Sequence, residues 1–277
     1  MEKTPIINIK ERQDVIYRII DIIKKSHDFL FIAYIDPDAL GSMLALGLTL
    51  KRLKKDVYFY VSKDTNLNVD FLSEIIKYND INILHTPEDI INTIKKIDCI
   101  FFCDTANKKV IPEYKKLEET FNTFSNEVIE IDHHFGTDAD KIIETSTALF
   151  ENANATCETV TKVLFKLDKD EDIKDQISDT VFRRNVVLSL LTGIISDTQF
   201  GKFLVSKRQY RSILNFLSIR LELSTLEKLK NFHKPEQIFK HLSTMSKENE
   251  NCLESLLKFT DKRKNYFLLD VSSDMSN

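Results

Sequence analysis

One stretch decides the fold prediction: Val128-Ile129-Glu130-Ile131-Asp132-His133-His134. A short apolar run ends here in a carboxylate and two imidazoles, which is typical of a buried strand carrying metal-binding side chains at its carboxyl end. Ligands of an open parallel sheet bind just beyond the carboxyl ends of its strands, so Asp132, His133 and His134 would lie at such a site. A polar loop after a strand explains the same residues, because two adjacent histidines can arise by chance among six. Other parts of the chain decide between these interpretations.

Two further apolar runs also lead into aspartates. Phe29 to Ile35 is followed by Asp36 and Asp38, and Cys99 to Cys103 is followed by Asp104. Because parallel strands place their carboxyl ends along one edge of a sheet, these side chains would meet the Asp-His-His sequence there. Taken singly, Asp38 is explained more simply as a helix N-cap and Asp36 as a turn residue. The convergence of three strands favours the metal-binding interpretation.

Strand patterns alternate with helical patterns along the first 205 residues. Helical spacing over Ile9 to Lys25 precedes the first strand, and Met43 to Lys55 follows it. The alternation continues over Val57 to Val61, Val69 to Tyr78, Ile81 to Leu84, Glu88 to Lys96 and Pro112 to Phe121. Such alternation predicts an α/β fold with helices on both faces of a mostly parallel sheet. We expect this domain over residues 1–205 and a helical connector over residues 206–277.

Composition and charge exclude several classes of protein. The 277 residues are 42% hydrophobic and 30% charged, which is enough for one large or two medium domains with a core. A net charge of −4 gives no overall attraction to duplex DNA or to a membrane surface. No apolar run approaches the ~18 to 20 residues that span a bilayer. The four cysteines show no CxxC spacing and no secretory leader precedes them, so we expect reduced thiols and a cytoplasmic location.

Carboxylates gathered at one sheet edge would repel one another without a cation. A pair of divalent metals, typically about 3.5 to 4 Å apart, relieves that repulsion and stabilises the oxygens of a phosphoryl transition state. Oxygen ligands with a few imidazoles suit Mn²⁺ or Mg²⁺ better than a soft metal. The sequence therefore predicts a site for one or two Mn²⁺ ions, with Mg²⁺ as the alternative.

Four short motifs follow one another along the chain. They are Asp36-Pro37-Asp38-Ala39-Leu40-Gly41-Ser42, Phe102-Cys103-Asp104-Thr105, Asp132-His133-His134 and Thr192-Gly193-Ile194-Ile195-Ser196-Asp197-Thr198. In this order they resemble the motifs of the DHH superfamily of phosphoesterases, over about residues 12–205. That superfamily includes oligoribonucleases, cyclic dinucleotide phosphodiesterases, a single-strand exonuclease and inorganic pyrophosphatases. Residues 153–158 also resemble the small-residue turn before the next helix of the family.

The resemblance implies a role for each residue of these motifs. Asp104 would bridge two metals, and Asp36 would hold the first of them. His134 would face the scissile phosphate, while Asp132 would fix the neighbouring imidazole, as carboxylates behind ligand histidines do. The remaining ligands of the second metal would be Asp38, His133 and Asp197.

One position departs from the family pattern. The family has a histidine four residues before the first aspartate of its first motif, and this chain has Ile32 there. His27 lies before the strand, and Tyr34 is a poor neutral ligand, so neither replaces it. Loss of one imidazole ligand weakens the binding of the first metal and the activation of the water bound to it. We therefore expect one tight metal site and one weaker site.

The sequence after the fourth motif is helical in pattern. Its apolar spacing covers Gln209 to Leu221, Leu226 to Phe232, Pro235 to Met245 and Asn251 to Phe259, which resembles the connector between two lobes. His233 and His241 are interpreted as surface or hydrogen-bonded histidines, and Tyr266 to Val271 as a single strand. Nucleotide-cleaving members have a C-terminal domain here, with a glycine-rich, histidine-bearing loop that grips phosphate. With five glycines and no adjacent pair, this lobe is expected to be absent or truncated.

Two hypotheses of function remain open at this point. The first is a Mn²⁺-dependent phosphodiesterase acting on short oligoribonucleotides or cyclic dinucleotides, which the four motifs favour. The second is a non-catalytic DHH protein that acts as a nucleotide-binding or regulatory partner, which Ile32 and the missing lobe favour. Both imply a small nucleotide or short single-stranded RNA as partner, without duplex DNA or a membrane, and both leave a homodimer open.

Overall fold

A six-stranded sheet forms the centre of the computed structural model, which describes residues 2–62 and 70–226. The strand order is β3-β2-β1-β4-β5-β6, and every neighbouring pair is parallel. The strands are β1 (Asp28–Ile32), β2 (Asp56–Tyr60), β3 (Asn82–Leu84), β4 (Cys99–Cys103), β5 (Glu127–Asp132) and β6 (Thr147–Phe150). The sheet extends from β1 to β3 on one side and from β4 to β6 on the other. The neighbours β1 and β4 therefore flank the switch point, where sheets of this kind bind ligands.

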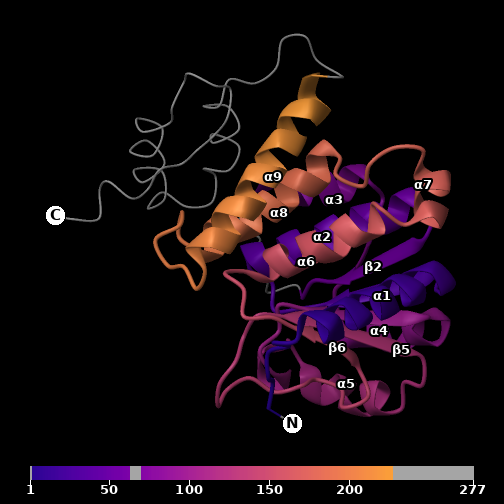
Figure 1. The fold of residues 1–277 in the computed structure, drawn as a ribbon. Helices are drawn as coiled ribbons and strands as arrows, with labels where there is room; N and C mark the ends of the chain where they lie inside the picture. The colour runs from indigo at the N-terminus through magenta and orange to yellow at the C-terminus, as the bar shows by residue number, and fades with distance from the viewer. Residues whose placement is uncertain (1, 63–69, 227–277) are drawn as a thin grey trace.

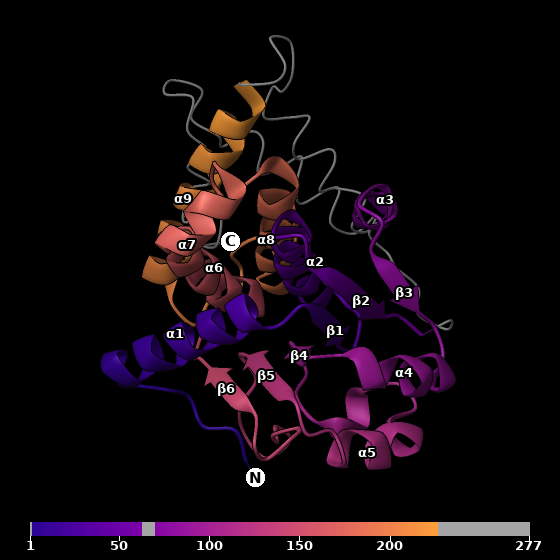
Figure 2. The same cartoon turned by 90° about the vertical axis from the view of Figure 1, so that its right-hand side faces the viewer.

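Helices cover both faces of the sheet, as Figures 1 and 2 show. One face carries α1 (Ile9–Lys25), α2 (Pro37–Arg52) and α6 (Thr156–Leu167), and the other carries α4 (Pro87–Thr93) and α5 (Tyr114–Asn122). A further layer lies beyond the first face, because α8 (Arg184–Asp197) packs on α2 and α6, and α9 (Lys207–Leu226) packs on α8. The shorter elements are α3 (Asp70–Tyr78), α7 (Glu171–Ile177) and the 3-10 turns η1 (Ile94–Lys96) and η2 (Lys108–Val110). The predicted α/β fold is confirmed.

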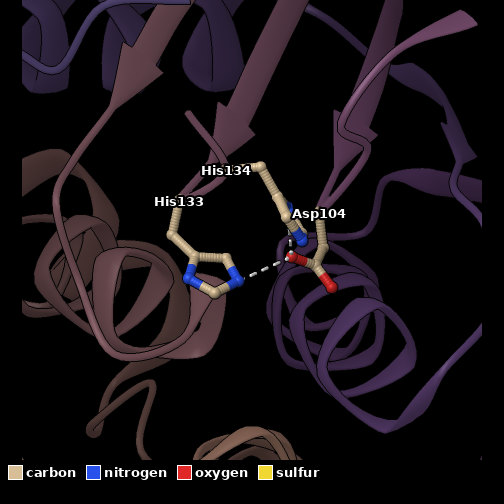
Figure 3. A group of neighbouring side chains, drawn as sticks. All are labelled: Asp104, His133 and His134. Carbon is tan, nitrogen blue, oxygen red and sulfur yellow. Dashed lines mark ion pairs between the residues drawn. The ribbon is translucent and has the colours of Figure 1, made fainter. Parts of the chain in front are cut away.

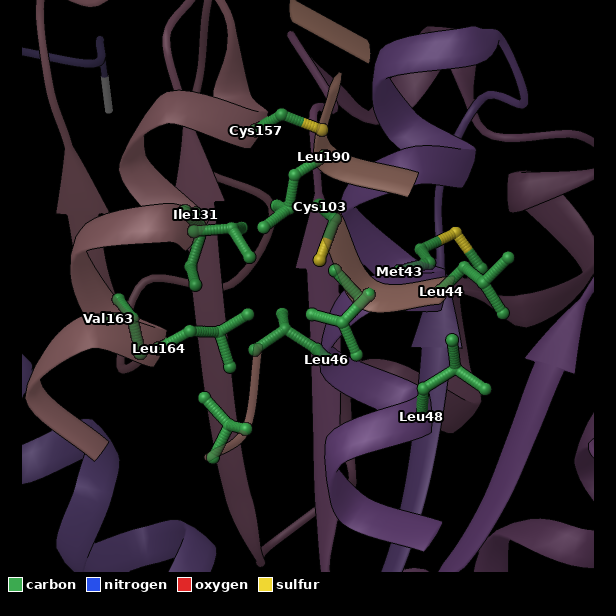
Figure 4. Packing of buried hydrophobic residues seen from close by; sticks show 14 of the residues in the cluster. Met43, Leu44, Leu46, Leu48, Cys103, Ile131, Cys157, Val163, Leu164 and Leu190 are labelled. Carbon is green, nitrogen blue, oxygen red and sulfur yellow. The ribbon is translucent and has the colours of Figure 1, made fainter. Parts of the chain in front are cut away.

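Alternate residues of β1, β2 and β4 enter two separate apolar clusters. In β1, Phe29 and Phe31 belong to the larger cluster under α2 and α6, whereas Leu30 and Ile32 belong to the smaller one beside α4 and α5. Figure 4 shows part of the larger cluster, where leucines of α2 meet side chains of α6, α8 and the central strands. Because both faces of these strands are buried, their sequences are continuously apolar rather than alternating.

The main differences from the predicted elements lie at the turn between β1 and α2. β1 ends at Ile32 instead of Ile35, and α2 begins at Pro37 instead of Met43. Proline suits the first helical turn because it lacks an N–H to satisfy, and Asp36 caps the helix by accepting from two backbone N–H groups. The alternative that Asp38 is the N-cap is therefore wrong, since Asp36 has that role. The strand β6 was not predicted from the sequence.

Helix α9 overlaps the first part of the predicted helical connector. The predicted helix Gln209 to Leu221 lies within α9, whose Tyr210, Leu214 and Leu217 are buried in the larger cluster. The boundary at residues 205 and 206 stays a prediction. The later helices and the strand Tyr266 to Val271 lie outside the described residues.

The described residues also bear on the predictions of reduced cysteines and of no membrane-spanning segment. Cys99, Cys103 and Cys157 are buried free thiols, and Cys252 lies outside the described ranges. Within residues 2–62 and 70–226, the helices are either too short or too polar to cross a membrane.

Candidate metal centre

The seven predicted site residues lie at the carboxyl edge of the central strands. Three chain segments follow β1, β4 and β5 directly, and the end of α8 completes the group. The β1–α2 turn supplies Asp36 and Asp38, and α8 ends in Asp197. The ends of β4 and β5 supply the remaining residues, which are Asp104, Asp132, His133 and His134. The convergence predicted from three strand ends is present in the structure, together with a fourth contribution from a helix end.

His133 is the centre of this group. Its Nε2 atom lies 3.4 Å from Asp104 Oδ1, 3.6 Å from Asp197 Oδ2 and 3.9 Å from Asp38 Oδ2. Its Nδ1 lies 3.3 Å from the Ala153 carbonyl oxygen, which can only accept, so Nδ1 carries a proton and Nε2 is the nitrogen that can ligate a cation once it is deprotonated. Nε2 is buried and has no hydrogen-bond partner. One imidazole nitrogen among three carboxylates is a donor set that fits a divalent cation.

Asp38 is held by the first turn of α6. This helix starts after Ala155, which has no side chain able to cap it. The Asp38 carboxylate takes that role from another element, because Thr156 N donates to its Oδ2 at 2.6 Å and Cys157 N to its Oδ1 at 3.0 Å. The positive end of a helix dipole also favours a carboxylate at this place. The small-residue turn at residues 153–158 thus orients both His133 and Asp38.

Asp104 occupies a backbone conformation that side chains other than glycine seldom adopt. Its φ angle is +52°, in the left-handed region, immediately after β4. Such residues occur mostly where the surrounding structure imposes them, often at functional sites. The Thr156 hydroxyl donates to Asp104 Oδ1 at 2.8 Å, which directs the carboxylate toward His133 (Figure 3).

Asp132 supports the second histidine rather than the first. Its Oδ1 accepts from His134 Nδ1 at 2.8 Å and from the backbone N–H groups of His133 and His134 at 2.8 and 3.2 Å. The imidazole that Asp132 fixes is therefore that of His134, while Ala153 fixes His133. His134 is about two-fifths exposed, with 43% of its side chain accessible, so its Nε2 is available to a ligand.

Lys3 contacts the other oxygen of Asp132, and the sequence did not predict this contact. Its Nζ lies 2.5 Å from Asp132 Oδ2 and 2.5 Å from the Thr105 carbonyl oxygen, and the residue is 2% exposed. A single lysine 129 positions before its partner gives no motif or spacing that sequence reasoning can use.

A second missed group connects the start of α9 to the small-residue turn. Glu158 is buried and accepts from Asn154 and from the Gln209 side chain. Asn154 also exchanges hydrogen bonds with the backbone of Ser206. The turn whose Ala153 carbonyl holds His133 is thus fixed from the side of α9.

Comparison with known proteins identifies the family of the chain. The model of the DHH family, N-terminal domain, matches residues 29–194, which is more than half of the chain. The chain belongs to the DHH family. Its curated relative, the uncharacterized protein MJ0988 of Methanocaldococcus jannaschii, is 29% identical over 189 residues, covering 66% of this chain and 49% of that protein. The DHH chain thus spans about half the length of the curated relative that it matches.

Two solved structures resemble this chain at low identity. An exopolyphosphatase-related protein from Bacteroides fragilis has a TM-score of 0.61 and 18% identity, over 90% of this chain and 66% of that one. RecJ from Thermus thermophilus, solved in complex with Mn²⁺, has a TM-score of 0.41 and 12% identity, over 93% of this chain and 38% of that one. The first of these likenesses supports the DHH fold of the described residues.

Crowding changes the ionisation of the DHH centre. Burial and the charge of Asp104 raise the pKa of Asp38, and burial also raises the pKa of Asp197. Asp36 is an exposed residue, yet partial removal of its carboxylate from water and the charge of Asp104 raise its pKa to about 7. Burial opposes protonation of His133, but the neighbouring Asp104 and the other carboxylates outweigh it and raise its pKa to about 10. Without a metal the cluster therefore retains protons at neutral pH.

Asp132 behaves in the opposite way. Burial would raise its pKa, but the hydrogen bond from His134 and the charge of Lys3 lower it to about 2. The same hydrogen bond raises the pKa of His134. This pair therefore favours a carboxylate beside an imidazolium.

A close helix crossing brings Asp197 to the other ligands. α2 and α8 meet at Gly41 and Gly193, where there is no room for side chains. A Cβ atom on Gly193 would lie 2.6 Å from Asp38 Oδ1 and 2.4 Å from Cys157 Sγ. The glycine of the fourth motif is therefore required by packing against the first motif.

We expect Gly193→Ala to separate α8 from α2 and to weaken Mn²⁺ binding. Overpacking of this kind costs about 1 to 3 kcal/mol of stability. Gly47→Ala is the matched control, because its Cβ would meet the Phe59 ring at 2.8 Å, away from the metal centre. Calorimetric titration with Mn²⁺ should show a weaker affinity for Gly193→Ala only. Equal affinities in the two variants would contradict the packing role of Gly193.

The metal-free protein should lose stability as the pH rises from about 6 to about 9. His133 and Asp36 have folded-state pKa values of about 10 and 7, above their ordinary values of 6.5 and 3.8. A raised pKa adds stability that is complete below the ordinary value and disappears as the pH rises through the folded value. Mn²⁺ needs deprotonated ligands, so the gain in melting temperature on adding Mn²⁺ should be larger at about pH 8 than at about pH 6. Thermal melts with chelator or with Mn²⁺ measure both trends, and a metal-free melting temperature that rises with pH would refute them.

Proposed function

We propose that this DHH protein is a Mn²⁺-dependent phosphodiesterase that hydrolyses short oligoribonucleotides or cyclic dinucleotides. The observation that carries the proposal is the buried, unpaired Nε2 of His133 facing the carboxylates of Asp38, Asp104 and Asp197 at 3.4 to 3.9 Å. A buried nitrogen without a partner is costly, and three anions beside it would repel one another. A divalent cation bound there removes both penalties.

The proposed reaction adds water across one P–O bond of a phosphodiester. Divalent metals supply an activated water and neutralise charge on the phosphate in such reactions. Asp38, His133 and Asp197 would hold one metal, with Asp104 shared between that metal and a second one beside Asp36. The remaining groups of the chain then orient the substrate.

His134 is the residue that we assign to the substrate phosphate. Its Nδ1 donates to Asp132, and the raised pKa favours the imidazolium form. In that form Nε2–H is also a donor, and the exposed part of the ring can direct it to a phosphate oxygen. A charge-assisted hydrogen bond of this kind stabilises the negative charge of the transition state.

The second candidate function is a non-catalytic nucleotide-binding or regulatory protein, and Ile32 favours it. Ile32 is fully buried in the smaller apolar cluster, so no imidazole reaches the first metal from this strand. Oδ1 of Asp36 is engaged by the N–H groups of Asp38 and Ala39. The first metal would therefore have few strong ligands, which would lower the rate of any hydrolysis.

The first test measures Mn²⁺ binding and hydrolysis together. We expect purified protein at about 100 times the Kd in free Mn²⁺ to gain about 2.7 kcal/mol of stability, whereas Asp104→Asn gains almost none. The exposed Asp21→Asn, far from the centre, is the control and should behave as the parent. A labelled diribonucleotide and cyclic di-AMP then serve as substrates. Mn²⁺ binding without turnover of either would favour the non-catalytic candidate, and no Mn²⁺ binding at all would refute both the metal centre and the proposed activity.

The second test restores the missing ligand. Ile32→His should be less stable without metal by about 1 to 3 kcal/mol, the cost of burying a polar group without a partner. It should bind an additional Mn²⁺ and cleave bis-p-nitrophenyl phosphate faster than the parent. Ile32→Gln, which is also polar but a poor metal ligand, is the matched control. A folded Ile32→His protein with no additional Mn²⁺ would show that position 32 is not the vacant ligand position.

A further inference from the structure

The segment before α1 brings a buried cation to the edge of the metal centre. Lys3 N donates to the Ala139 carbonyl at 2.9 Å, and Ile6 N donates to the Phe150 carbonyl at 2.8 Å. Glu2 forms an isolated antiparallel bridge with Asp140. These bonds fix the segment against the loop after the Asp-His-His sequence and against the end of β6.

The position of the Lys3 ammonium group is well defined by its surroundings. It contacts Asp132 Oδ2 and the Thr105 carbonyl, and it lies 5.0 Å from the centre of the Phe150 ring. A buried lysine is tolerated only where such partners replace its hydration. The side chain therefore cannot move away from Asp132 without losing them.

The two oxygens of Asp132 have separate partners. Oδ2 contacts Lys3, and Oδ1 accepts from the His134 ring and from two backbone N–H groups. With Oδ2 anchored, rotation of the carboxylate is blocked and Oδ1 stays directed at His134. The ring of His133 is held independently, through the Ala153 carbonyl.

We propose that Lys3 is a positioning residue, which holds the Asp132 carboxylate and through it the His134 imidazole in the orientation needed at the substrate phosphate. This inference rests on the proposed phosphodiesterase function for the role of His134. It predicts a defined separation of effects. Loss of Lys3 disturbs His134 and leaves the ligands Asp38, Asp104 and Asp197 with His133 unchanged.

The main experiment compares Lys3→Met with Lys3→Arg. For Lys3→Met we expect kcat to fall about 10- to 100-fold, the range seen when a group supporting a functional histidine is removed, while KM and the Kd for Mn²⁺ change little. Lys3→Arg keeps the charge and should recover most of kcat. Lys10→Met, on an exposed lysine of the same part of the chain, is the control and should match the parent. A Lys3→Met protein with the parental kcat, or with Mn²⁺ affinity reduced as much as kcat, would overturn the proposal.

A double-mutant cycle covers the case in which Lys3→Met folds poorly. Removing one member of a buried ion pair leaves an unpaired charge, whereas Lys3→Met combined with Asp132→Asn leaves none. If Lys3 acts through Asp132, the double variant should have the kcat of Asp132→Asn alone. If the kcat of the double variant is instead well below that of Asp132→Asn, Lys3 acts by another route and the proposal is wrong.

A spectroscopic measurement separates this proposal from the proposed function. In the Mg²⁺-loaded protein, ¹⁵N NMR of the His134 ring should report a single state with Nδ1 protonated, and Lys3→Met should show exchange between states. This readout does not need turnover, so an inactive parent refutes the phosphodiesterase while the His134 spectrum still decides the role of Lys3. An unchanged His134 spectrum in Lys3→Met refutes the positioning role, whether or not the parent is active.

Discussion

The repulsion among carboxylates around His133 is the constraint on which the rest of this structure depends. Asp38 and Asp104 are almost fully buried, and Asp197 is only about one-third exposed, yet all three approach one imidazole nitrogen. Three contacts hold these carboxylates close together. The first turn of α6 binds Asp38, and the Thr156 hydroxyl binds Asp104. The close crossing of α2 and α8 brings Asp197 to them. A group of anions that the scaffold holds together in this way is arranged for a cation.

The two adjacent histidines differ because of what their Nδ1 atoms contact. Nδ1 of His133 faces a backbone carbonyl, so Nε2 is the nitrogen that this ring can offer to a cation among the carboxylates. Nδ1 of His134 faces the Asp132 carboxylate, which favours a positively charged ring with a donor at its exposed side. Neighbouring residues of one type thus differ in chemistry, one suited to ligate a cation and the other suited to donate to an anion.

The sequence predicts the parts of the site that lie on strand ends, and it misses the parts that reach them from elsewhere. Asp104 and the Asp-His-His sequence are predictable because a parallel sheet brings its carboxyl ends to one edge. Asp197 at the end of α8 is identified only by family resemblance, since a helix end carries no such rule. Lys3 and Gln209 have no signal, because their contacts span 129 and 51 positions and depend on how loops and helices pack. One interpretation assigns the cap of α2 to Asp38, because spacing alone does not show which oxygen meets the free N–H groups.

The burial of Ile32 and the capping role of Asp36 both bear on the proposed first metal site. With an apolar residue at position 32, β1 ends inside the smaller apolar cluster, and burial there gives stability instead of metal binding. Asp36 has one oxygen engaged as the N-cap of α2, where it accepts from two backbone N–H groups. Asp36 therefore has an established role in capping the fold, whereas Asp38 is fully buried and its carboxylate is bound by the first turn of α6. Under the proposed function, this asymmetry would make one metal site strong and the other weak, and the rate of hydrolysis would depend on the weak one.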